Sequence, residues 1–389
     1  MKALADIRDY VKLSDTDLDY IARAETFAEA WIAPNAAEWE RRRQPGLPRD
    51  VIEAWVSSGL IGTNVPRAHG GGGASFLAKI GIVEVLARSC LPSSFALCNV
   101  LNGPFRVARD ASADQIARYL PALMSGKSII ALALTEPQSG SDFAATATVA
   151  RRVSGGWRLS GRKAWVTHAT IADLCIVYAQ TNPEQRAKGI ASFIVNLRQP
   201  GCTVTAPYAL ETGSVIGVCD LVLEDCFVPD ADVMQPPGEA FSRALGSINA
   251  ARTHVAAMCC GMTGAALAVA VGYARNRQAF GTAVTSHQGI RWKIADLAAE
   301  LESARLLTYR AAELVEARQD AVAAAAIAKK QAVEMTSRCL PECLQIMGAN
   351  GLRSEYPVAR HLLSSRIAAF VDGTTEIQKD RIGRLVVGR

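Results

Sequence analysis

The sequence lacks the short motifs that mark several large enzyme classes. It has no G-x-G-x-x-G after an expected strand, no G-x-x-x-x-G-K-[ST], no G-x-S-x-G and no H-E-x-x-H. These motifs are typical of nicotinamide-binding Rossmann domains, P-loop nucleotide hydrolases, α/β-hydrolases and zinc peptidases. Their absence argues against all four classes.

Signatures of metal and nucleic-acid binding are missing as well. The ten cysteines form no C-x-x-C pair and no Cys/His cluster with zinc spacing. Lys and Arg number 42 against 37 Asp and Glu, a net charge of +5. This mild excess suits a small anionic ligand and is far from the clustered basic charge of a nucleic-acid binder. We expect no metal, no nucleic-acid partner, and buried thiols in a reducing compartment.

The N-terminal segment shows no targeting pattern. Five aspartates fall within the first twenty residues, and no apolar core of a signal peptide is present. We therefore expect a cytoplasmic protein. Residues 255–274 form an uncharged run long enough to span a bilayer, but the run is rich in Ala and Gly. It predicts a buried bundle helix, and we expect no contact with a membrane.

The hydrophobic periodicity changes twice along the chain, which predicts an α+β protein with three domains. Residues 1–127 have helical periodicity and predict an N-terminal helical domain. Residues 128–236 consist of short β-branched runs separated by turn residues, which predict an antiparallel, β-barrel-like middle domain. Residues 237–389 predict a C-terminal four-helix bundle, because apolar positions from Ile290 to Val315 recur every three or four residues.

Five segments carry side chains suited to binding or catalysis. They are residues 133–142 (ALTEPQSGSD), 163–167 (KAWVT), 277–288 (RQAFGTAVTSHQ), 345–357 (QIMGANGLRSEYP) and 371–378 (VDGTTEIQ). The first is a small-residue and hydroxyl loop that suits phosphate oxygens, and the second presents an aromatic ring and a hydroxyl on one strand face. Taken singly, each segment is also explained by an ordinary structural role. Trp165 suits a core position, His287 or Asp372 a helix cap, and Gly348 a helix C-terminus.

Together and in this order, the five segments resemble the acyl-CoA dehydrogenase family, over nearly the whole chain. The resemblance implies an FAD-dependent dehydrogenase of acyl thioesters, carried on CoA or on a carrier protein. It also implies a homo-oligomer, usually a tetramer, because neighbouring subunits share the cofactor. Electrons would pass to an electron-transfer flavoprotein or, in an oxidase, to oxygen.

The resemblance also implies roles for individual residues. The implied FAD-binding residues are Leu134, Thr135, Ser141, Trp165, Thr167, Arg277, Phe280, His287, Gln288, Gln345, Gly348, Thr374 and Glu376. Arg252 and Gly373 are the implied substrate-binding residues, and Asp372 is the implied catalytic base. In such a reaction a carboxylate takes the proton next to the thioester carbonyl while a hydride leaves the neighbouring carbon.

The base position departs from the family pattern, which has Glu in an E-G-T turn. Here the turn begins with Asp372, one methylene shorter, and Ala251 occupies the alternative base position found in one branch of the family. Three explanations stay open: a turn closer to the cofactor, a differently presented substrate, or a substrate with a more acidic proton. The third resembles nitroalkane oxidase, which uses an Asp at this turn but has Arg where this chain has Lys379.

A second departure weakens the expectation of CoA as the carrier. Residues 210–218 lack the family's G-x-R-G-S pattern, so a thioester on a carrier protein stays open as an alternative. Two further alternatives are an FAD-binding family member without dehydrogenase activity and a protein that binds no flavin.

Overall fold

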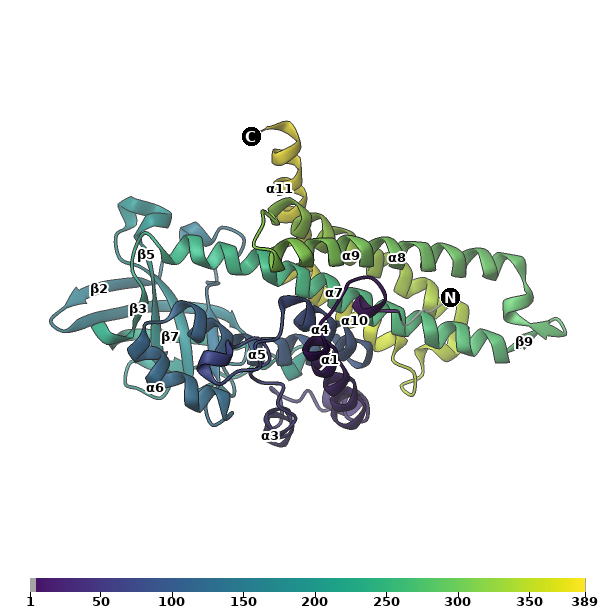
Figure 1. The fold of residues 1–389 in the computed structure, drawn as a ribbon, viewed down its shortest axis with the longest axis horizontal. Helices are drawn as coiled ribbons and strands as arrows, with labels where there is room; N and C mark the ends of the chain where they lie inside the picture. Colours follow the sequence, from purple (N-terminus) through teal and green to yellow (C-terminus); the bar gives the residue numbers. More distant parts are fainter. Residues whose placement is uncertain (1–4, 389) are drawn as a thin grey trace. The chain divides into compact units, whose positions relative to one another are not determined.

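The computed structural model describes residues 5–388, which form two compact units. The β unit comprises residues 42–73 and 96–247, and the helical unit comprises residues 5–41, 74–95 and 248–388. Two helices run from one unit into the other: α5 (Leu91–Asp110) and α7 (Ala240–Asn276). Each unit is described by itself below (Figure 1).

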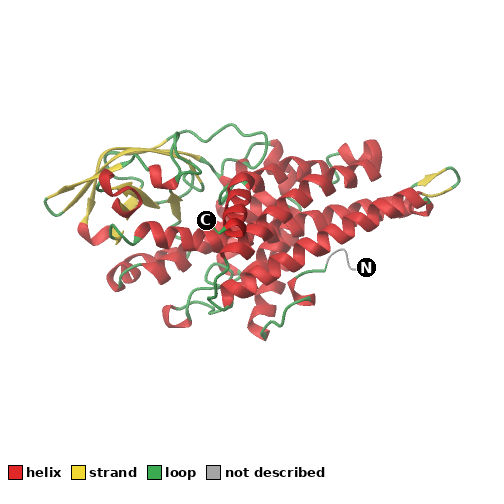
Figure 2. Ribbon diagram, turned by 90° about the horizontal axis from the view of Figure 1, so that it is seen from above, coloured by secondary structure: helices red, strands yellow, loops and turns green. Residues whose placement is uncertain are grey.

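The β unit is built around one eight-stranded sheet, drawn in yellow in Figure 2. The strands are β1 (Ile130–Ala133), β2 (Val149–Val153), β3 (Gly156–Val166), β4 (Leu174–Gln180), β5 (Ile190–Asn196), β6 (Cys202–Val204), β7 (Cys219–Pro229) and β8 (Val233–Gln235). Their order is β6-β7-β3-β2-β4-β5-β8, and β1 pairs with β4. Its helices and helical turns are α3 (Arg49–Ser57), α6 (Ala113–Met124), η3 (Arg67–His69), η4 (Phe143–Ala145), η5 (Pro183–Gly189), η6 (Ser214–Ile216) and η7 (Asp230–Asp232).

Alternation along the central strands buries both faces of this sheet. On β4, Cys175 and Val177 enter one apolar cluster, while Ile176 and Tyr178 enter another. The second cluster includes side chains of α5 and α6, such as Val107 and Leu120, so these helices cover that face. A strand with both faces buried has a continuous apolar sequence instead of an alternating one. Residues 174–179 have such a sequence.

The structure confirms the α+β class and corrects two details of the middle domain. The sheet is mixed and not purely antiparallel, because β1 and β2 both pair with β4 in parallel. It is also open: among residues 5–388, no strand pairing joins the end strands β6 and β8 into a closed barrel. Parallel neighbours need long connections, so local turn signals in the sequence do not reveal them.

The helical unit consists mainly of long helices. They are α1 (Asp15–Phe27), α2 (Ala36–Arg41), α4 (Phe76–Ser89), most of α7, α8 (Gln288–Glu316), α9 (Val322–Met347), α10 (Val358–Phe370) and α11 (Thr375–Val387). Shorter elements are η1 (Ile7–Asp9), η2 (Ala28–Ile32), η8 (Val284–Ser286), η9 (Gly348–Leu352) and the hairpin β9 (Gln278–Ala279) and β10 (Thr282–Ala283). The predicted four-helix bundle is therefore incomplete as a description, because five helices follow residue 237 and α1 and α4 pack in the same unit.

Helix α9 is central to the helical unit, since α8, α10 and α11 all pack against it. Figure 1 shows α8 and α9 running side by side. The predicted seam of α8 is buried, including Leu297, Leu301 and Ala304. The apolar run 255–274 lies in α7, the one helix of the described chain that length and composition would allow to cross a membrane. Of its most apolar window, 78% is buried inside the protein, as in a core helix.

Candidate functional site

The loop after β1, the first predicted binding segment, is fastened by a buried ion pair. The Lys163 Nζ donates to the Glu136 carboxylate at 2.7 Å and to the Leu134 carbonyl at 3.1 Å. The same carboxylate accepts the backbone N–H groups of Ala147 at 2.7 Å and Thr148 at 2.9 Å. The predicted segments 133–142 and 163–167 therefore lie side by side.

Both charges of this pair are fully buried, and their pKa values respond to it. Burial lowers the pKa of Lys163 to about 8, although Glu136 opposes the shift. The pKa of Glu136 is lowered: burial alone would raise it, and the charge and hydrogen bond of Lys163 outweigh burial. No role for Glu136 followed from the sequence. The structure shows that it secures the loop.

Trp165 projects from a distorted end of strand β3. Its backbone φ is +57°, in the left-handed region, and the pairing of β3 with β7 shifts register between Lys163 and Val166. The side chain is 58% exposed, so the core interpretation of Trp165 is wrong. A strained backbone that presents an aromatic ring to solvent is common at ligand sites.

A polar network supports one side of the Trp165 indole. The Tyr208 ring lies 4.6 Å from the indole, and its hydroxyl donates to the buried Asp220 carboxylate. Arg162 Nε donates to the same carboxylate at 2.7 Å. No sequence motif pointed to Tyr208 or Asp220. The only signal was their position beside residues 210–218, where the family pattern fails.

Three predicted hydroxyl residues of the β unit are available to a ligand. Ser141 is exposed, and Thr135 and Thr167 are half-buried. Within residues 5–388 none of these hydroxyls has a hydrogen-bond partner, while the Thr135 carbonyl accepts the Ala164 N–H at 2.9 Å. Hydroxyl groups and an exposed indole on neighbouring segments suit a planar ring that carries polar substituents.

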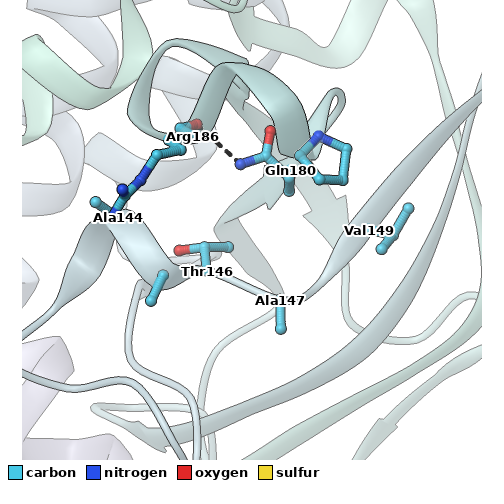
Figure 3. Close-up of a pocket in the computed structure, with 8 residues that line it drawn as sticks. Ala144, Thr146, Ala147, Val149, Gln180 and Arg186 are labelled. Carbon is cyan, nitrogen blue, oxygen red and sulfur yellow. Dashed lines mark hydrogen bonds between the residues drawn. The ribbon is translucent and has the colours of Figure 1, made fainter.

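An open hollow of about 500 Å³ lies in the same unit (Figure 3). It is lined by residues 144–147 and by residues of β2, β4 and η5, and within it Gln180 Nε2 donates to the Arg186 carbonyl at 2.9 Å. None of the predicted site residues lines it. We assign it no role, because its side chains are mostly small and aliphatic.

In the helical unit, the predicted base lies on a strained turn between α10 and α11. Asp372 has φ +52° and Gly373 has φ +87°, so two successive residues adopt the left-handed conformation. A Cβ at Gly373 would lie 3.0 Å from the Gln378 amide nitrogen, which favours glycine there. The N-cap of α11 is Thr374, whose hydroxyl accepts the Ile377 N–H. Asp372 is therefore not the helix cap that the alternative interpretation proposed.

Arg252 of α7 lies against this turn. Its Nε donates to the Asp372 carbonyl at 3.3 Å, and its NH1 donates to Asn249 at 2.6 Å. Arg252 is 3% exposed. Burial and the charge of Arg381 lower its pKa to about 10, and the Asp372 carboxylate opposes this shift. The predicted residues Arg252, Asp372 and Gly373 are therefore neighbours.

The remaining predicted residues lie on the surface of the helical unit. Phe280 sits at the tip of the β9–β10 hairpin, with φ +52° and 98% exposure. Figure 2 shows this hairpin beyond the helix ends. His287 Nε2 lies 3.2 Å from the Ala279 carbonyl and makes no cap hydrogen bond to α8. The exposed members of this set are Arg277, Gln288, Gln345, Gly348 and Glu376.

Comparison with known proteins identifies the family. Family models for the N-terminal, middle and C-terminal domains of acyl-CoA dehydrogenase match residues 14–127, 131–226 and 238–387. The human mitochondrial short-chain specific acyl-CoA dehydrogenase is 34% identical over 382 residues, which cover 97% of this chain and 92% of the human protein. The chain belongs to the acyl-CoA dehydrogenase family.

Solved structures of similar proteins agree with this assignment. Butyryl-CoA dehydrogenase from Megasphaera elsdenii is 30% identical with a TM-score of 0.92, covering 97% of this chain and 99% of that one. The prolyl acyl carrier protein oxidase AnaB is 25% identical with a TM-score of 0.89, covering 96% and 100%. This chain is thus an oxidoreductase of the acyl-CoA dehydrogenase family, with the fold of that family.

Three of the candidate residues share an unusual backbone conformation. Trp165, Phe280 and Asp372 all have positive φ, and only eight non-glycine residues of the described chain do. Such conformations cost about 1–3 kcal/mol each and persist where surrounding contacts enforce them. In this acyl-CoA dehydrogenase family member, backbone strain therefore falls on three of the residues that the motifs single out.

Proposed function

We propose that this protein is an FAD-dependent acyl-thioester dehydrogenase in which Asp372 is the catalytic base. The observation that carries the proposal is the Asp372 turn. A carboxylate is held on a strained turn whose carbonyl is bound by the buried Arg252. A base needs this fixed position, because a misplacement of about 1 Å can slow a reaction by ~10²-fold.

The proposed reaction begins with the carbon next to the thioester carbonyl. Asp372 takes the proton from this carbon, and the C–H bond electrons form the new carbon–carbon double bond as a hydride leaves the next carbon. FAD, when bound, supplies the hydride acceptor. Asp372 then carries a proton that it must release before the next cycle.

The β unit supports FAD as the cofactor. Its exposed Trp165 indole is backed by Tyr208, and Thr135 and Thr167, whose hydroxyls have no partner in the described chain, lie on the same two neighbouring segments. These groups fit a planar ring with polar edges. We propose that the FAD-binding residues are Leu134, Thr135, Ser141, Trp165, Thr167, Arg277, Phe280, His287, Gln288, Gln345, Gly348, Thr374 and Glu376, with Gly373 and Arg252 beside the substrate.

The acyl carrier is either CoA or a carrier protein. The names of the human relative and the Megasphaera elsdenii enzyme favour a short acyl-CoA. The altered segment 210–218 and the similarity to a prolyl acyl carrier protein oxidase favour the carrier protein. We take acyl-CoA as the first substrate to test, because the more similar proteins bear that name.

We further propose a cytoplasmic homotetramer that passes electrons to an electron-transfer flavoprotein or to oxygen. The exposed Phe280 at a hairpin tip supports assembly, because a large aromatic ring gains free energy when a partner covers it. All ten cysteines are free thiols, which supports a reducing compartment. The boundaries after residues 127 and 236 are proposed for the three domains.

The experiment that tests the function is an anaerobic titration of the purified, FAD-loaded protein. Butyryl-CoA, octanoyl-CoA, a prolyl carrier protein and nitroethane are added separately, and bleaching of the flavin absorption is followed. We expect bleaching by one thioester and formation of its α,β-unsaturated product.

The titration also separates the alternatives. Bleaching by nitroethane alone would assign the protein to the nitroalkane oxidase type. A loaded flavin that no thioester in the panel bleaches would contradict dehydrogenation of these substrates. A chain that takes up no FAD would contradict the cofactor as well.

A further inference from the structure

A lysine is buried in the middle of the central helix α9. The side chain of Lys329 has 0% exposure, whereas the next residue, Lys330, is 27% exposed and pairs with Glu334 at 2.8 Å. Removing an ammonium group from water is costly unless fixed partners replace the water. The groups that bind the Lys329 ammonium therefore indicate the role of this buried residue.

Those partners are the main-chain carbonyls on either side of the proposed base. Lys329 Nζ donates to the Val371 carbonyl and to the Gly373 carbonyl. The Asp372 carbonyl between them accepts Arg252 Nε at 3.3 Å. Three successive carbonyls of the turn are therefore held by two buried cationic side chains.

A further side chain strengthens this arrangement. Gln378 of α11 is fully buried, and its Nε2 donates to the Gly373 carbonyl at 2.9 Å and to the Thr374 carbonyl at 3.3 Å. The turn is thus fixed from α7, α9 and α11 together. This network accounts for the positive φ of Asp372, because conformations of this kind need surrounding contacts to enforce them.

The carbonyl contacts also orient the opposite side of each peptide unit. In a trans peptide the N–H points away from the carbonyl. Because the Val371 carbonyl faces Lys329, the Asp372 N–H faces away from it. Such a fixed N–H can serve as a donor where negative charge develops on a substrate oxygen.

We propose that Lys329 is a positioning residue that holds the Val371–Gly373 turn and so directs both the carboxylate and the N–H of Asp372 toward the substrate. This inference rests on the proposed function, in which Asp372 is the base. Lys329 contacts the turn from inside the protein and is not itself a catalytic residue.

Lys329 is linked to Asp372 by charge as well as by the geometry of its hydrogen bonds. Burial lowers the pKa of Lys329 to about 8, and the Asp372 carboxylate opposes that shift. The other charged or titratable groups that act on it are Arg252, Cys259 and Glu376. The lysine therefore supplies positive charge behind the proposed base, which favours the carboxylate form of Asp372.

The first test is free of substrate and uses thermal unfolding of the full-length, FAD-loaded protein. Lys329→Met, Asp372→Asn and the double variant form a mutant cycle, and Lys330→Met replaces Lys329→Met in the control cycle. We expect Lys329→Met to lower the Tm by less in the Asp372→Asn background than in the wild type, while Lys330→Met and Asp372→Asn add independently. Additive effects of Lys329→Met and Asp372→Asn would overturn the proposal. Should Lys329→Met fail to fold, Lys329→Gln, which keeps one donor, takes its place.

The second test follows flavin reduction in a single turnover, with the thioester from the titration panel that bleaches the flavin fastest. We expect Lys329→Met to slow the saturated rate by about 10–100-fold while the half-saturating concentration changes little, because the substrate still binds. The acidic limb of the rate–pH profile should move to higher pH, since a positive charge near the base is lost. Lys330→Met should behave as the wild type.

An unchanged rate and an unchanged acidic limb in Lys329→Met would overturn the positioning role. Failure of the proposed function has a different result: Asp372→Asn would then reduce the flavin as fast as the wild type. In that case the unfolding cycle still decides whether Lys329 is coupled to the Asp372 carboxylate.

Discussion

Two buried lysines, one in each unit, fasten candidate site segments in different ways. Lys163 in the β unit forms a direct ion pair with Glu136, whose carboxylate also accepts two backbone N–H groups. Lys329 in the helical unit donates to the carbonyls on either side of Asp372 and acts on its carboxylate through charge. The difference separates two roles: the acid beside Lys163 secures a loop, and the acid beside Lys329 is the proposed base.

The largest expected effect follows from neutralising the acid beside Lys329. Asp372→Asn keeps the size of the side chain, and Asn tolerates the left-handed backbone of this position. We expect the rate of flavin reduction by the thioester to fall by about 10³-fold, the usual contribution of a positioned base. Stopped-flow absorbance measures the rate, and Asp380→Asn, at an exposed position of α11, is the matched control. A loss below tenfold would remove Asp372 from the role of base.

The next effect concerns the structural pair. Lys163→Met leaves the Glu136 carboxylate buried without its ammonium partner, which typically costs about 3–5 kcal/mol of unfolding free energy. Chemical denaturation of the full chain measures this loss, and Lys188→Met, at an exposed position of η5, should leave stability unchanged. Equal stability of the two variants would show that the pair contributes little.

The pH dependence of stability sharpens the comparison for Lys329. Its folded pKa, about 8, lies below the ordinary value of 10.5, so the unfolded chain binds more protons between these values. Stability conferred by Lys329 therefore rises with pH across this window, at up to about 1.4 kcal/mol per pH unit. The measurement is the unfolding free energy of the wild type minus that of Lys329→Met, taken from pH 7.5 to 10.5. A flat difference, as expected for Lys330→Met, would contradict the pKa shift.

The smallest effect tests the support of Trp165. Tyr208→Phe removes the hydroxyl that donates to Asp220 but keeps the ring beside the indole. Because Arg162 still pairs with Asp220, we expect a loss of about 1–2 kcal/mol in unfolding free energy and slightly weaker FAD binding. Tyr20→Phe, in α1, is the control for a tyrosine outside this network. Unchanged FAD release from the Tyr208→Phe protein would show that the ring alone supports Trp165.

Local patterns in the sequence predicted much of this molecule. The apolar spacing in residues 290–315 predicted α8, and the runs at 129–134 and 174–179 predicted β1 and β4. Ordered motifs led to the family and to Trp165 and Asp372. These features depend on neighbours within a few residues, which a single sequence displays directly.

Features that depend on distant contacts escaped prediction. Lys329 reads as one of two adjacent charged residues in an Ala-rich helix, and only the packing of α9 shows which of them is buried. The contacts between Tyr208, Asp220 and Arg162 join three separate segments, as does the parallel pairing of β1 with β4. Such pairings leave no periodic pattern in the sequence, because they form between segments that meet only in the folded protein.

Under the proposed assembly, the exposed Phe280 links cofactor retention to protein concentration. If a second copy covers this ring and the hairpin completes the partner's FAD site, then binding of FAD and assembly are linked by mass action. Dilution would release subunits and cofactor together, and excess FAD would hold the assembly intact. Specific activity would then fall in very dilute assays and recover when free FAD is added, without any change in the chain itself.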